Sequence, residues 1–504
     1  MNVVQAIARQ ALSRPKAPAL ITPNGVVSYE QLMGDVLRLA SRMAQLGVRR
    51  GDVVGILARN SLPHVWLTLA TAWLGGISVS LGTEGSDEDK ARNAELCGVK
   101  FFFHGDVDVP KFATPGAVVR MSVRELFAQA PSPEPVRMVQ AEPQDIWRIA
   151  FTSGTTGRPK AMKIAHEAMI LKNHALGSIV PVLPQDRVLV QMGTGLVFAV
   201  TYWMRTLAAG AAVVARQESA DKAWEALQLY QVTFLVTSPG NALGMLAVAR
   251  GQGEAVRPAS LRRTMLGGAA VSPAQRAQVR RELCENLLIN YGASEVGMVA
   301  LLNPALMDSD PACAGRLVDY LEVQAVDPKG QPIPPGQGEG LLRMRSATMA
   351  SGYILSPDAS VDDAQAFRDG WFYSKDIGRV ALDGRVYLSG RASDVINLGG
   401  VKVDPARVEE LLAREPGVLE CAVVGVADQH AVVSLVAVIV PQGEVDWPRL
   451  QRRCAEVLPA IAVPRGFVTL DALPRNASGK VMRAELAKGI RRGSPGKTPV
   501  GVPA

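Results

Sequence analysis

The stretch of this sequence with the clearest chemical meaning runs from Thr152 to Lys160 and reads TSGTTGRPK. Its glycines let the backbone turn so that several N–H groups converge on one point, its hydroxyls add donors, and its lysine adds a positive charge. Such a loop suits a polyphosphate. Only two residues separate Gly154 from Gly157, whereas the common P-loop has four and then Lys-Ser/Thr. The string therefore indicates a phosphate site of another type, although a Gly/Ser/Thr loop standing alone is more often an ordinary loop.

Later strings carry groups that suit a nucleotide and a metal ion. In the string NYGASE, the aromatic ring of Tyr291 beside a glycine can stack on a flat base, and Glu295 can hold Mg²⁺, a hard cation that prefers oxygen ligands. Asp376 ends the string GWFYSKD and suits the two hydroxyls of a ribose. Taken alone, the string NYGASE is more often a turn at the end of a strand with a solvated glutamate.

Three further strings can be interpreted from their place in the sequence. The glycines in Gly267-Gly268-Ala269 would let a planar group approach the backbone, although such a string standing alone is more often a tight turn. The string Gly390–Asp394 lies where the sequence pattern changes and suits a hinge. Lys480 lies on a short loop near the end of the chain, where a lysine is normally a solvated charge.

The elements that must position these groups follow from the hydrophobic pattern. A predicted buried strand, 146–151, leads into the phosphate loop. From residue 1 to about 340, short apolar runs alternate with amphipathic stretches, the βαβ rhythm of mostly parallel sheets covered by helices. After about residue 318 the pattern changes to short strands with turns, among them 320–326, 339–344 and 379–388, and from 389 to a compact α+β pattern.

The predicted fold class is therefore α/β, with doubly wound, mostly parallel sheets, a small barrel-like β subdomain and a small α+β C-terminal domain. We expect an N-terminal domain over 1–388, whose β-rich part covers about 318–388, and a hinge at 389–393. A mobile C-terminal domain over 394–490 and a flexible tail over 491–504 follow.

Length and composition limit the function classes. A chain of 504 residues is too long for one ordinary core, and 48% apolar with 20% charged residues is typical of a globular protein. The five cysteines form no CxxC pair, which favours a reducing cytoplasm over a disulfide framework or zinc site. Basic clusters interleaved with aromatics are absent despite the net charge of +7, and no apolar run is long enough to span a membrane. We therefore expect a cytoplasmic protein without a nucleic-acid partner or membrane span, and we expect it to be a monomer or homodimer.

Taken in order, the strings resemble the adenylate-forming superfamily, which contains acyl- and aryl-CoA synthetases, the adenylation domains of peptide synthetases and firefly luciferase. The resemblance begins at Ser28-Tyr29-Glu30-Gln31-Leu32, similar to the family's early TYxEL string, and extends to Lys480. It covers nearly the whole chain, and five separated motifs in the family's order leave little room for chance.

The resemblance implies a role for each matching residue. The β- and γ-phosphates of ATP would be held by Thr152, Ser153, Gly154, Thr155, Thr156, Gly157 and Lys160. The adenine pocket would be lined by Gly267, Gly268, Ala269, Tyr291 and Gly292. Ser294 would contact the α-phosphate side, Glu295 would bind Mg²⁺, and Asp376 with Arg391 would take the ribose hydroxyls. Lys480 would bridge the substrate carboxylate and the nucleotide, and the expected catalytic residues are Lys480, Glu295 and Thr155.

The resemblance also implies two conformations, between which the C-terminal domain rotates. Rotation would replace Lys480 by the glycine pair Gly399-Gly400, which matches the family's thiol tunnel. The family usually has an acidic residue or lysine at the hinge, and Ser393 stands there in this chain.

The acyl pocket departs from the family pattern. Many CoA ligases of the family carry a PLxH string whose last residue gates the pocket, but the corresponding stretch reads QMGTGLVF and no histidine lies between His174 and His430. Members that activate amino acids usually place an aspartate on this helix, and its absence disfavours an α-amino acid. The expected pocket wall is largely apolar and suits a fatty, branched or aryl acid; it comprises Met192, Thr194, Val197, Phe198, Tyr202 and Gly268.

The resemblance implies an ATP-dependent acid–thiol ligase that forms an acyl-adenylate, releases pyrophosphate and acylates coenzyme A. The alternative is an adenylating enzyme that loads the phosphopantetheine of a separate carrier protein or acylates an amine. A nucleotide-binding homologue without catalysis is disfavoured, because Lys160, Glu295, Asp376 and Lys480 are all present.

Overall fold

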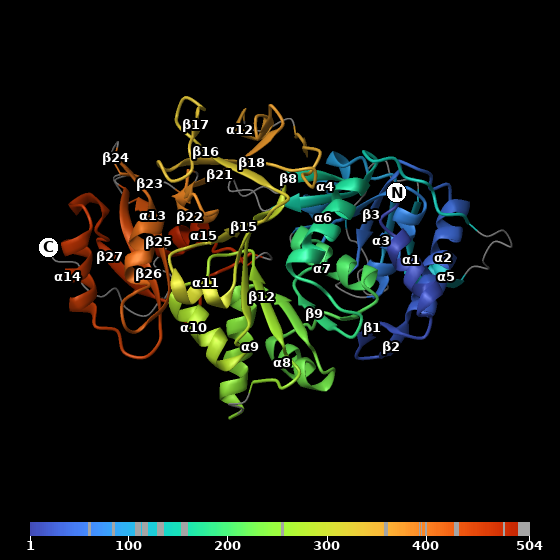
Figure 1. Ribbon diagram of the computed structural model, residues 1–504, viewed down its shortest axis with the longest axis horizontal. Coiled ribbons are helices and arrows are strands. Elements are labelled where there is room, and N and C mark those ends of the chain that lie inside the picture. Colours follow the sequence, from blue (N-terminus) through green and yellow to red (C-terminus); the bar gives the residue numbers. More distant parts are fainter. Residues whose placement is uncertain are drawn as a thin grey trace.

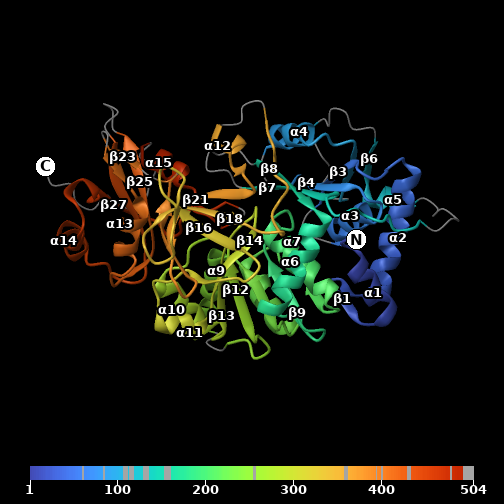
Figure 2. The same cartoon turned by 45° about the horizontal axis from the view of Figure 1, so that its top comes forward.

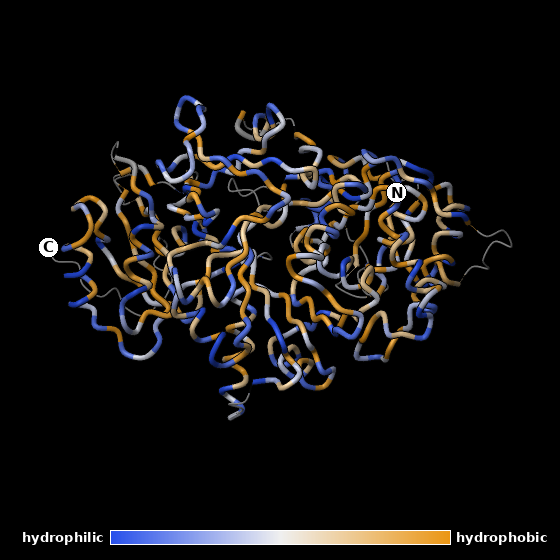
Figure 3. Tube along the Cα trace, in the orientation of Figure 1, coloured by the Kyte–Doolittle hydropathy of each residue, from blue (hydrophilic) through white to orange (hydrophobic). Residues whose placement is uncertain are grey.

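The computed structural model describes residues 1–58, 62–82, 86–105, 112, 119–128, 136–152, 160–253, 257–356, 361–392, 394, 396–398, 401–427, 433–476 and 479–491. Within them, two large sheets with flanking helices are followed by a small C-terminal unit (Figure 1). The predicted α/β fold class is confirmed. Figure 3 shows apolar residues concentrated along the interior strands and hydrophilic residues toward the periphery.

The first sheet has seven strands in the order β19-β8-β7-β4-β3-β5-β6. The strands are β3 (Val53–Leu57), β4 (Ile77–Ser80), β5 (Phe101–His104), β6 (Val119–Ser122), β7 (Ile146–Thr152), β8 (Lys160–Ala165) and β19 (Tyr353–Ile354). Five of them, from β6 to β7, are parallel, and β8 and β19 add an antiparallel edge. Every residue of β5 is buried, as expected for a parallel strand covered on both faces. The connecting helices are α3 (Leu62–Trp73), α4 (Asp87–Leu96) and α5 (Val123–Ala128).

The second sheet has fifteen strands, and its parallel part runs in the order β1-β10-β9-β11-β12-β13. These strands are β1 (Pro18–Thr22), β9 (Arg187–Gln191), β10 (Ala212–Val214), β11 (Phe234–Thr237), β12 (Arg263–Gly267) and β13 (Leu287–Ala293), with β2 (Gly25–Ser28) antiparallel at the edge. The helices of this region are α1 (Gln5–Ser13), α2 (Tyr29–Gln45), α6 (His166–Ile179), α7 (Val197–Ala208), α8 (Ala220–Leu229), α9 (Pro239–Gly251) and α10 (Pro273–Glu282).

From β13 onward the second sheet becomes antiparallel. The strands are β14 (Gly297–Leu302), β15 (Gly315–Leu317), β16 (Glu322–Val326), β17 (Pro332–Ile333), β18 (Gly340–Arg345), β20 (Phe367–Arg368), β21 (Trp371–Val380) and β22 (Arg385–Arg391), with the short helices α11 (Pro304–Ser309) and α12 (Val361–Ala364). The β-rich region is thus joined by hydrogen bonds to the parallel part through β13, β14 and β15.

The C-terminal unit packs helices on both faces of a three-stranded sheet. Its elements are β23 (Ile396–Leu398), β24 (Val401–Val403), α13 (Pro405–Leu412), β25 (Val418–Ala427), β26 (Val433–Pro441), α14 (Trp447–Val457), a 3₁₀ turn (Ala460–Ala462), β27 (Gly466–Thr469) and α15 (Arg483–Arg491). Alternate residues of β25 point to opposite faces: Val423 joins the core beneath α13 and α14, whereas Val424 joins the core beneath α15. In Figures 1 and 2 the unit lies at one end of the molecule, beside α10.

Helix starts follow local capping chemistry. Ser28 and Gln31 form a reciprocal capping box before α2, and Ser272 and Gln275 do so before α10. Ser238 accepts a hydrogen bond from the backbone N–H of Asn241 and caps α9.

Three details differ from the sequence prediction. The stretch 379–388 is the end of β21, a turn and the start of β22, because Asp383 and Gly384 reverse the chain. The pattern analysis treated 370–376 only as a motif, although it begins the ten-residue strand β21. It also missed β27 and α15, the two elements before the C-terminal tail, which itself lies outside the described residues beyond Arg491.

None of the helices in the described part of the chain is long and apolar enough to cross a bilayer. The five cysteines are free thiols, and four of them are buried.

Candidate active site

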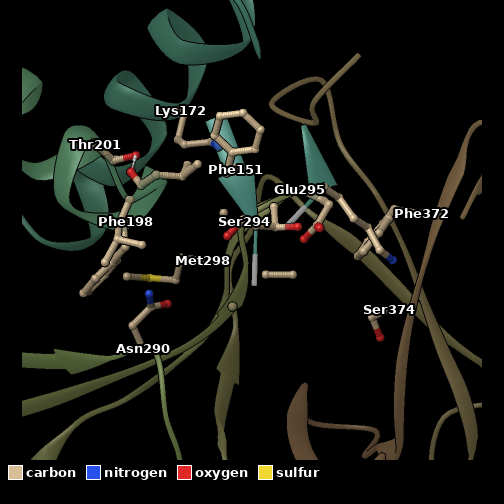
Figure 4. A pocket seen from close by; sticks show the side chains of 18 of the residues that line it. Phe151, Lys172, Phe198, Thr201, Asn290, Ser294, Glu295, Met298, Phe372 and Ser374 are labelled. Carbon is tan, nitrogen blue, oxygen red and sulfur yellow. Dashed lines mark hydrogen bonds between the residues drawn. The ribbon is translucent and has the colours of Figure 1, made fainter. Parts of the chain in front are cut away.

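One cavity of about 180 Å³ lies where the two large sheets and the C-terminal unit meet. Its wall is built by β7, β8, α6 and α7 on one side, by the β13–β14 hairpin in the middle, and by β21 and β22 on the other. Figure 4 shows Phe198 and Thr201 on one side of the cavity, Ser294 and Glu295 at its centre, and Phe372 and Ser374 on the opposite side.

Both ends of the phosphate loop meet at this cavity. Thr152 is the last residue of β7 and Lys160 is the first of β8, and the two residues are paired across the antiparallel ladder. Both line the cavity. The loop residues Ser153, Gly154, Thr155, Thr156 and Gly157 lie outside the described residues.

Glu295 occupies the turn between β13 and β14 and is 7% exposed. The Tyr353 hydroxyl donates a hydrogen bond of 2.5 Å to its Oε1, and Lys160 Nζ lies 5.3 Å from the centre of the Tyr353 ring. The backbone N–H of Ala350 donates to the Glu295 carbonyl at 2.7 Å. Glu295 is therefore held in place from the β19 side, and Tyr353 links it to the end of the phosphate loop.

The carboxylate of Glu295 fits a Mg²⁺ ion that is shared with phosphates. Among the described residues, no group of three or more His, Cys, Asp or Glu side chains is placed to hold a metal ion. Mg²⁺ commonly binds through one or two carboxylates together with substrate phosphates and water. A single carboxylate facing a phosphate loop agrees with that mode of binding.

Asp376 accepts hydrogen bonds from a guanidinium cation and from a neutral hydroxyl. Arg391 Nε donates to its Oδ1 at 2.6 Å across the β21–β22 pair, and the Tyr291 hydroxyl donates to its Oδ2 at 2.8 Å. Burial and the adjacent Asp376 carboxylate raise the pKa of Tyr291 well above its ordinary value, so the hydroxyl remains a donor. Although burial opposes it, the charge of Asp376 raises the pKa of Arg391, which stays a cation.

Lys480 enters the cavity from the C-terminal unit. The loop that carries it is closed by Asn476, whose Oδ1 accepts from the Lys480 N–H at 3.0 Å and whose N–H donates to the Lys480 carbonyl at 3.0 Å. Burial and then the charge of Arg391 lower the pKa of Lys480, while the carboxylates of Glu295 and Asp376 oppose this shift. The ammonium group thus lies within the electrostatic reach of both acids.

The contacts that place the C-terminal unit against the rest of the chain include one polar cluster. Glu420 accepts from Gln275 Nε2 at 2.7 Å through Oε1 and from Arg475 Nη2 at 2.9 Å through Oε2. At Gly390 a Cβ would lie 1.9 Å from an oxygen of Asp404, so only glycine fits there. Gly390, which belongs to the predicted hinge, is therefore tightly packed against Asp404. Ser393, Gly399 and Gly400 lie outside the described residues.

Five of the six residues predicted to line the acyl pocket lie at the main cavity. Met192, Val197, Phe198, Tyr202 and Gly268 line the cavity. Thr194 lies instead at a smaller apolar cavity beside β1 and β10, where its carbonyl accepts a hydrogen bond from the buried Arg148. The Phe198 ring packs directly on Gly267, where a Cβ would come within 2.8 Å of Cζ. Gly267 therefore supports the pocket wall, and Ala269 is not among the residues that line the cavity.

The remaining predicted residues fall into two groups. Gly292, Ser294, Arg391 and Lys480 line the cavity directly. Tyr291 and Asp376 do not line it but are hydrogen-bonded at its edge, where Asp376 contacts Arg391.

Among the residues at this site that the sequence prediction missed, two interact with Glu295. Tyr353 binds Glu295, and Lys172 of α6 lines the cavity with only 2% of its surface exposed. Burial lowers the pKa of Lys172 to about 8, and the charge of Glu295 opposes the shift. One signal was available for Lys172: it lies on the buried stripe of α6, with Ala168, Met169 and Leu176.

Comparison with known proteins gives a consistent result. The family "AMP-binding enzyme" matches residues 7–354, and the family "AMP-binding enzyme C-terminal domain" matches residues 407–480. The chain is 27% identical to a 2-succinylbenzoate–CoA ligase of Bacillus mycoides (95% of this chain, 97% of the relative). It is 26% identical to the long-chain-fatty-acid–CoA ligase FadD13 of Mycobacterium tuberculosis (96% and 98%).

Among solved structures, the chain resembles the o-succinylbenzoate CoA synthetase of Bacillus subtilis in complex with its acyl-adenylate intermediate. The TM-score is 0.83 with 24% identity, over 98% of this chain and 99% of that one. This likeness agrees with the fold described above. Because a family model spans more than half of its length, the chain belongs to the AMP-binding enzymes, the adenylate-forming superfamily that its motifs resemble.

Proposed function

We propose that this enzyme activates a carboxylic acid with ATP as an acyl-adenylate, releases pyrophosphate, and transfers the acyl group to the thiol of coenzyme A. The observation that carries the proposal is the meeting of Lys480 with Glu295 and the two ends of the phosphate loop at one cavity. The similarity to CoA ligases along almost the whole chain supports the same reaction.

The first half-reaction needs charge neutralisation, because two anions must approach each other. An oxygen of the substrate carboxylate attacks the α-phosphorus of ATP, the bond from that phosphorus to the bridging oxygen breaks, and pyrophosphate leaves. Lys480 would neutralise charge between the carboxylate and the α-phosphate, and Lys160 would act on the leaving pyrophosphate. Bound at Glu295, Mg²⁺ would add Lewis-acid stabilisation of the phosphate oxygens.

The nucleoside would be oriented by the acid at the other side of the cavity. Asp376 already accepts two hydrogen bonds, one to each oxygen, and each carboxylate oxygen retains a lone pair for a ribose hydroxyl. The hydrogen bond from Arg391 fixes the direction of this carboxylate. Gly268 leaves room at the wall for the flat base. At Gly292 a Cβ would lie 2.3 Å from the Gly297 carbonyl oxygen, so this glycine allows the close approach within the β13–β14 hairpin.

In the second half-reaction, the thiol of coenzyme A is the nucleophile and AMP is the leaving group. The thiol of coenzyme A loses its proton, its sulfur attacks the acyl carbon, and the bond from that carbon to the AMP oxygen breaks. The present position of Lys480 is the one that serves adenylate formation. A rotation of the C-terminal unit about residues 389–393 would withdraw Lys480 and bring Gly399 and Gly400 to the site.

The test is acid-dependent release of pyrophosphate over a panel of fatty, aryl and amino acids, followed by mass spectrometry of the products with coenzyme A or a holo carrier protein. We expect AMP, pyrophosphate and an acyl-CoA with a subset of the fatty or aryl acids. Transfer to the carrier but not to coenzyme A would replace the acceptor and leave the first half-reaction standing. Acid-independent release of ADP and orthophosphate would refute the proposal.

A further inference from the structure

The acyl side of the cavity contains a buried cation that the reaction described above does not use. Lys172 lies in the middle of α6, on the stripe that faces the core, and it lines the cavity together with Phe198 and Thr201 (Figure 4). A lysine at such a position is almost never buried without a partner.

Lys172 has no such partner in the part of the chain that the structure describes. Neither a hydrogen bond nor an ion pair within 4.0 Å is formed by its Nζ there. Its closest environment includes the β13–β14 hairpin, where a Cβ at Gly297 would come within 3.0 Å of Lys172 Cε and 3.3 Å of Nζ. The absence of a side chain at position 297 thus makes room for the ammonium group at the cavity wall.

Lys172 and Lys480, which both line the cavity, experience different charges. Arg391, Asp376, Asp394 and Glu295 all act on Lys480, whereas Glu295 is the charged group, among the described residues, that acts on Lys172. Lys480 therefore belongs to the nucleotide side. Lys172 lies on the other side of Glu295, together with the residues of α7, and in Figure 4 it is far from Ser374.

Other polar atoms near the acyl side are also available to a ligand. Thr201 donates its proton to the Val197 carbonyl at 2.8 Å, so its oxygen keeps its lone pairs. The Oδ1 atom of Asn290 is buried and has no hydrogen-bond partner among the described residues. The pocket that the sequence predicted as apolar therefore contains, within the described part of the chain, the cation Lys172 and two hydrogen-bond acceptors.

We propose that Lys172 binds a second anionic group on the substrate, so that the preferred acid carries a carboxylate or similar anion remote from the carboxylate that reacts. This inference rests on the proposed function and specifies its substrate class. The second anion would supply the missing partner of Lys172 in a site that excludes water, where a charge-assisted hydrogen bond is strong.

Matched pairs of acids test the proposal: adipate against hexanoate, and terephthalate against 4-methylbenzoate. The wild type is expected to prefer the diacid of at least one pair in kcat/KM for pyrophosphate release. The variant Lys172→Met should lose that preference by about 10- to 100-fold, the range of a charge-assisted hydrogen bond, and Lys172→Arg should retain most of it. Lys222→Met, at an exposed lysine of α8, is the matched control and should leave the preference unchanged.

A binding measurement separates this inference from the proposed function. In thermal-shift titrations without ATP, the preferred diacid should stabilise the wild type and Lys172→Arg but not Lys172→Met. Preference for the monoacid in both pairs, or an equal loss for diacid and monoacid in Lys172→Met, would overturn the inference while leaving acid activation intact. Failure of acid activation itself would instead appear as the absence of acid-dependent pyrophosphate release, and the diacid titration would still decide the role of Lys172.

Discussion

Replacing Lys172 by methionine should stabilise the protein at neutral pH. Burial lowers the pKa of Lys172 from 10.5 to about 8, so below pH 8 the folded state holds a charge that the unfolded chain solvates more favourably. Lowering the pKa from 10.5 to about 8 corresponds to about 3 kcal/mol. Because the folded pKa is depressed, this penalty is complete below pH 8, shrinks between pH 8 and 10.5, and vanishes above 10.5. The advantage of Lys172→Met over the wild type should follow the same course.

The assay is urea unfolding without ligands at pH 7, 8, 9 and 10, followed by tryptophan fluorescence. Six of the seven tryptophans precede residue 389 and only Trp447 follows it, so the signal reports mainly the region that contains Lys172. We expect Lys172→Met to have a higher urea midpoint than the wild type at pH 7. The difference between the two midpoints should shrink by pH 10, and Lys222→Met should match the wild type. A lower midpoint at pH 7, or a difference that does not change with pH, would refute the reasoning.

Three predictions concern the residues around the nucleotide. Lys480→Ala should abolish adenylate formation but leave thioester formation from preformed acyl-AMP largely intact, as measured by separate assays of the half-reactions; equal loss in both would contradict its role. Tyr353→Phe removes the hydrogen bond to Glu295 and should weaken the apparent Mg²⁺ affinity by about 10- to 100-fold in magnesium titrations of activity, and an unchanged magnesium requirement would count against it. Asp376→Asn leaves the Arg391 charge without its ion pair, so it should raise the KM for ATP by about 10-fold or more and lower the melting temperature; an unaltered KM would exclude Asp376 from the ribose site.

The groups that local motifs carry were predictable from the sequence. Glu295, Asp376 and Lys480 each stand in a short string with a recognisable pattern, and the structure brings Glu295 and Lys480 to one cavity, with Asp376 hydrogen-bonded at its edge. The alternation of strands and helices also predicted the parallel sheets, because their buried strands read as continuous apolar runs such as β5.

Tyr353 and Lys172 were missed because their positions at the site depend on contacts with segments that are distant in the sequence. Tyr353 belongs to a two-residue strand that pairs with β8, where Tyr353 lies opposite Met162. No local pattern marks so short a strand. A lysine within a helix is normally solvated, and only the packing of α6 beside the β13–β14 hairpin shows that Lys172 is buried.

The shape of the acyl pocket was also beyond the sequence pattern. The stretch 191–198 appeared apolar, yet Thr194 lies outside the main cavity and Lys172 and Asn290, from other elements, line it. A pocket wall combines side chains from several segments, so the composition of one segment does not determine its polarity.

The central claim is that the substrate carboxylate attacks the α-phosphorus of ATP. The most direct test uses an accepted acid labelled with ¹⁸O in its carboxylate, with mass spectrometry of the nucleotide after transfer to coenzyme A. One labelled oxygen is predicted in AMP, with unlabelled pyrophosphate. Label in orthophosphate together with ADP would show attack at the γ-phosphorus and contradict the account.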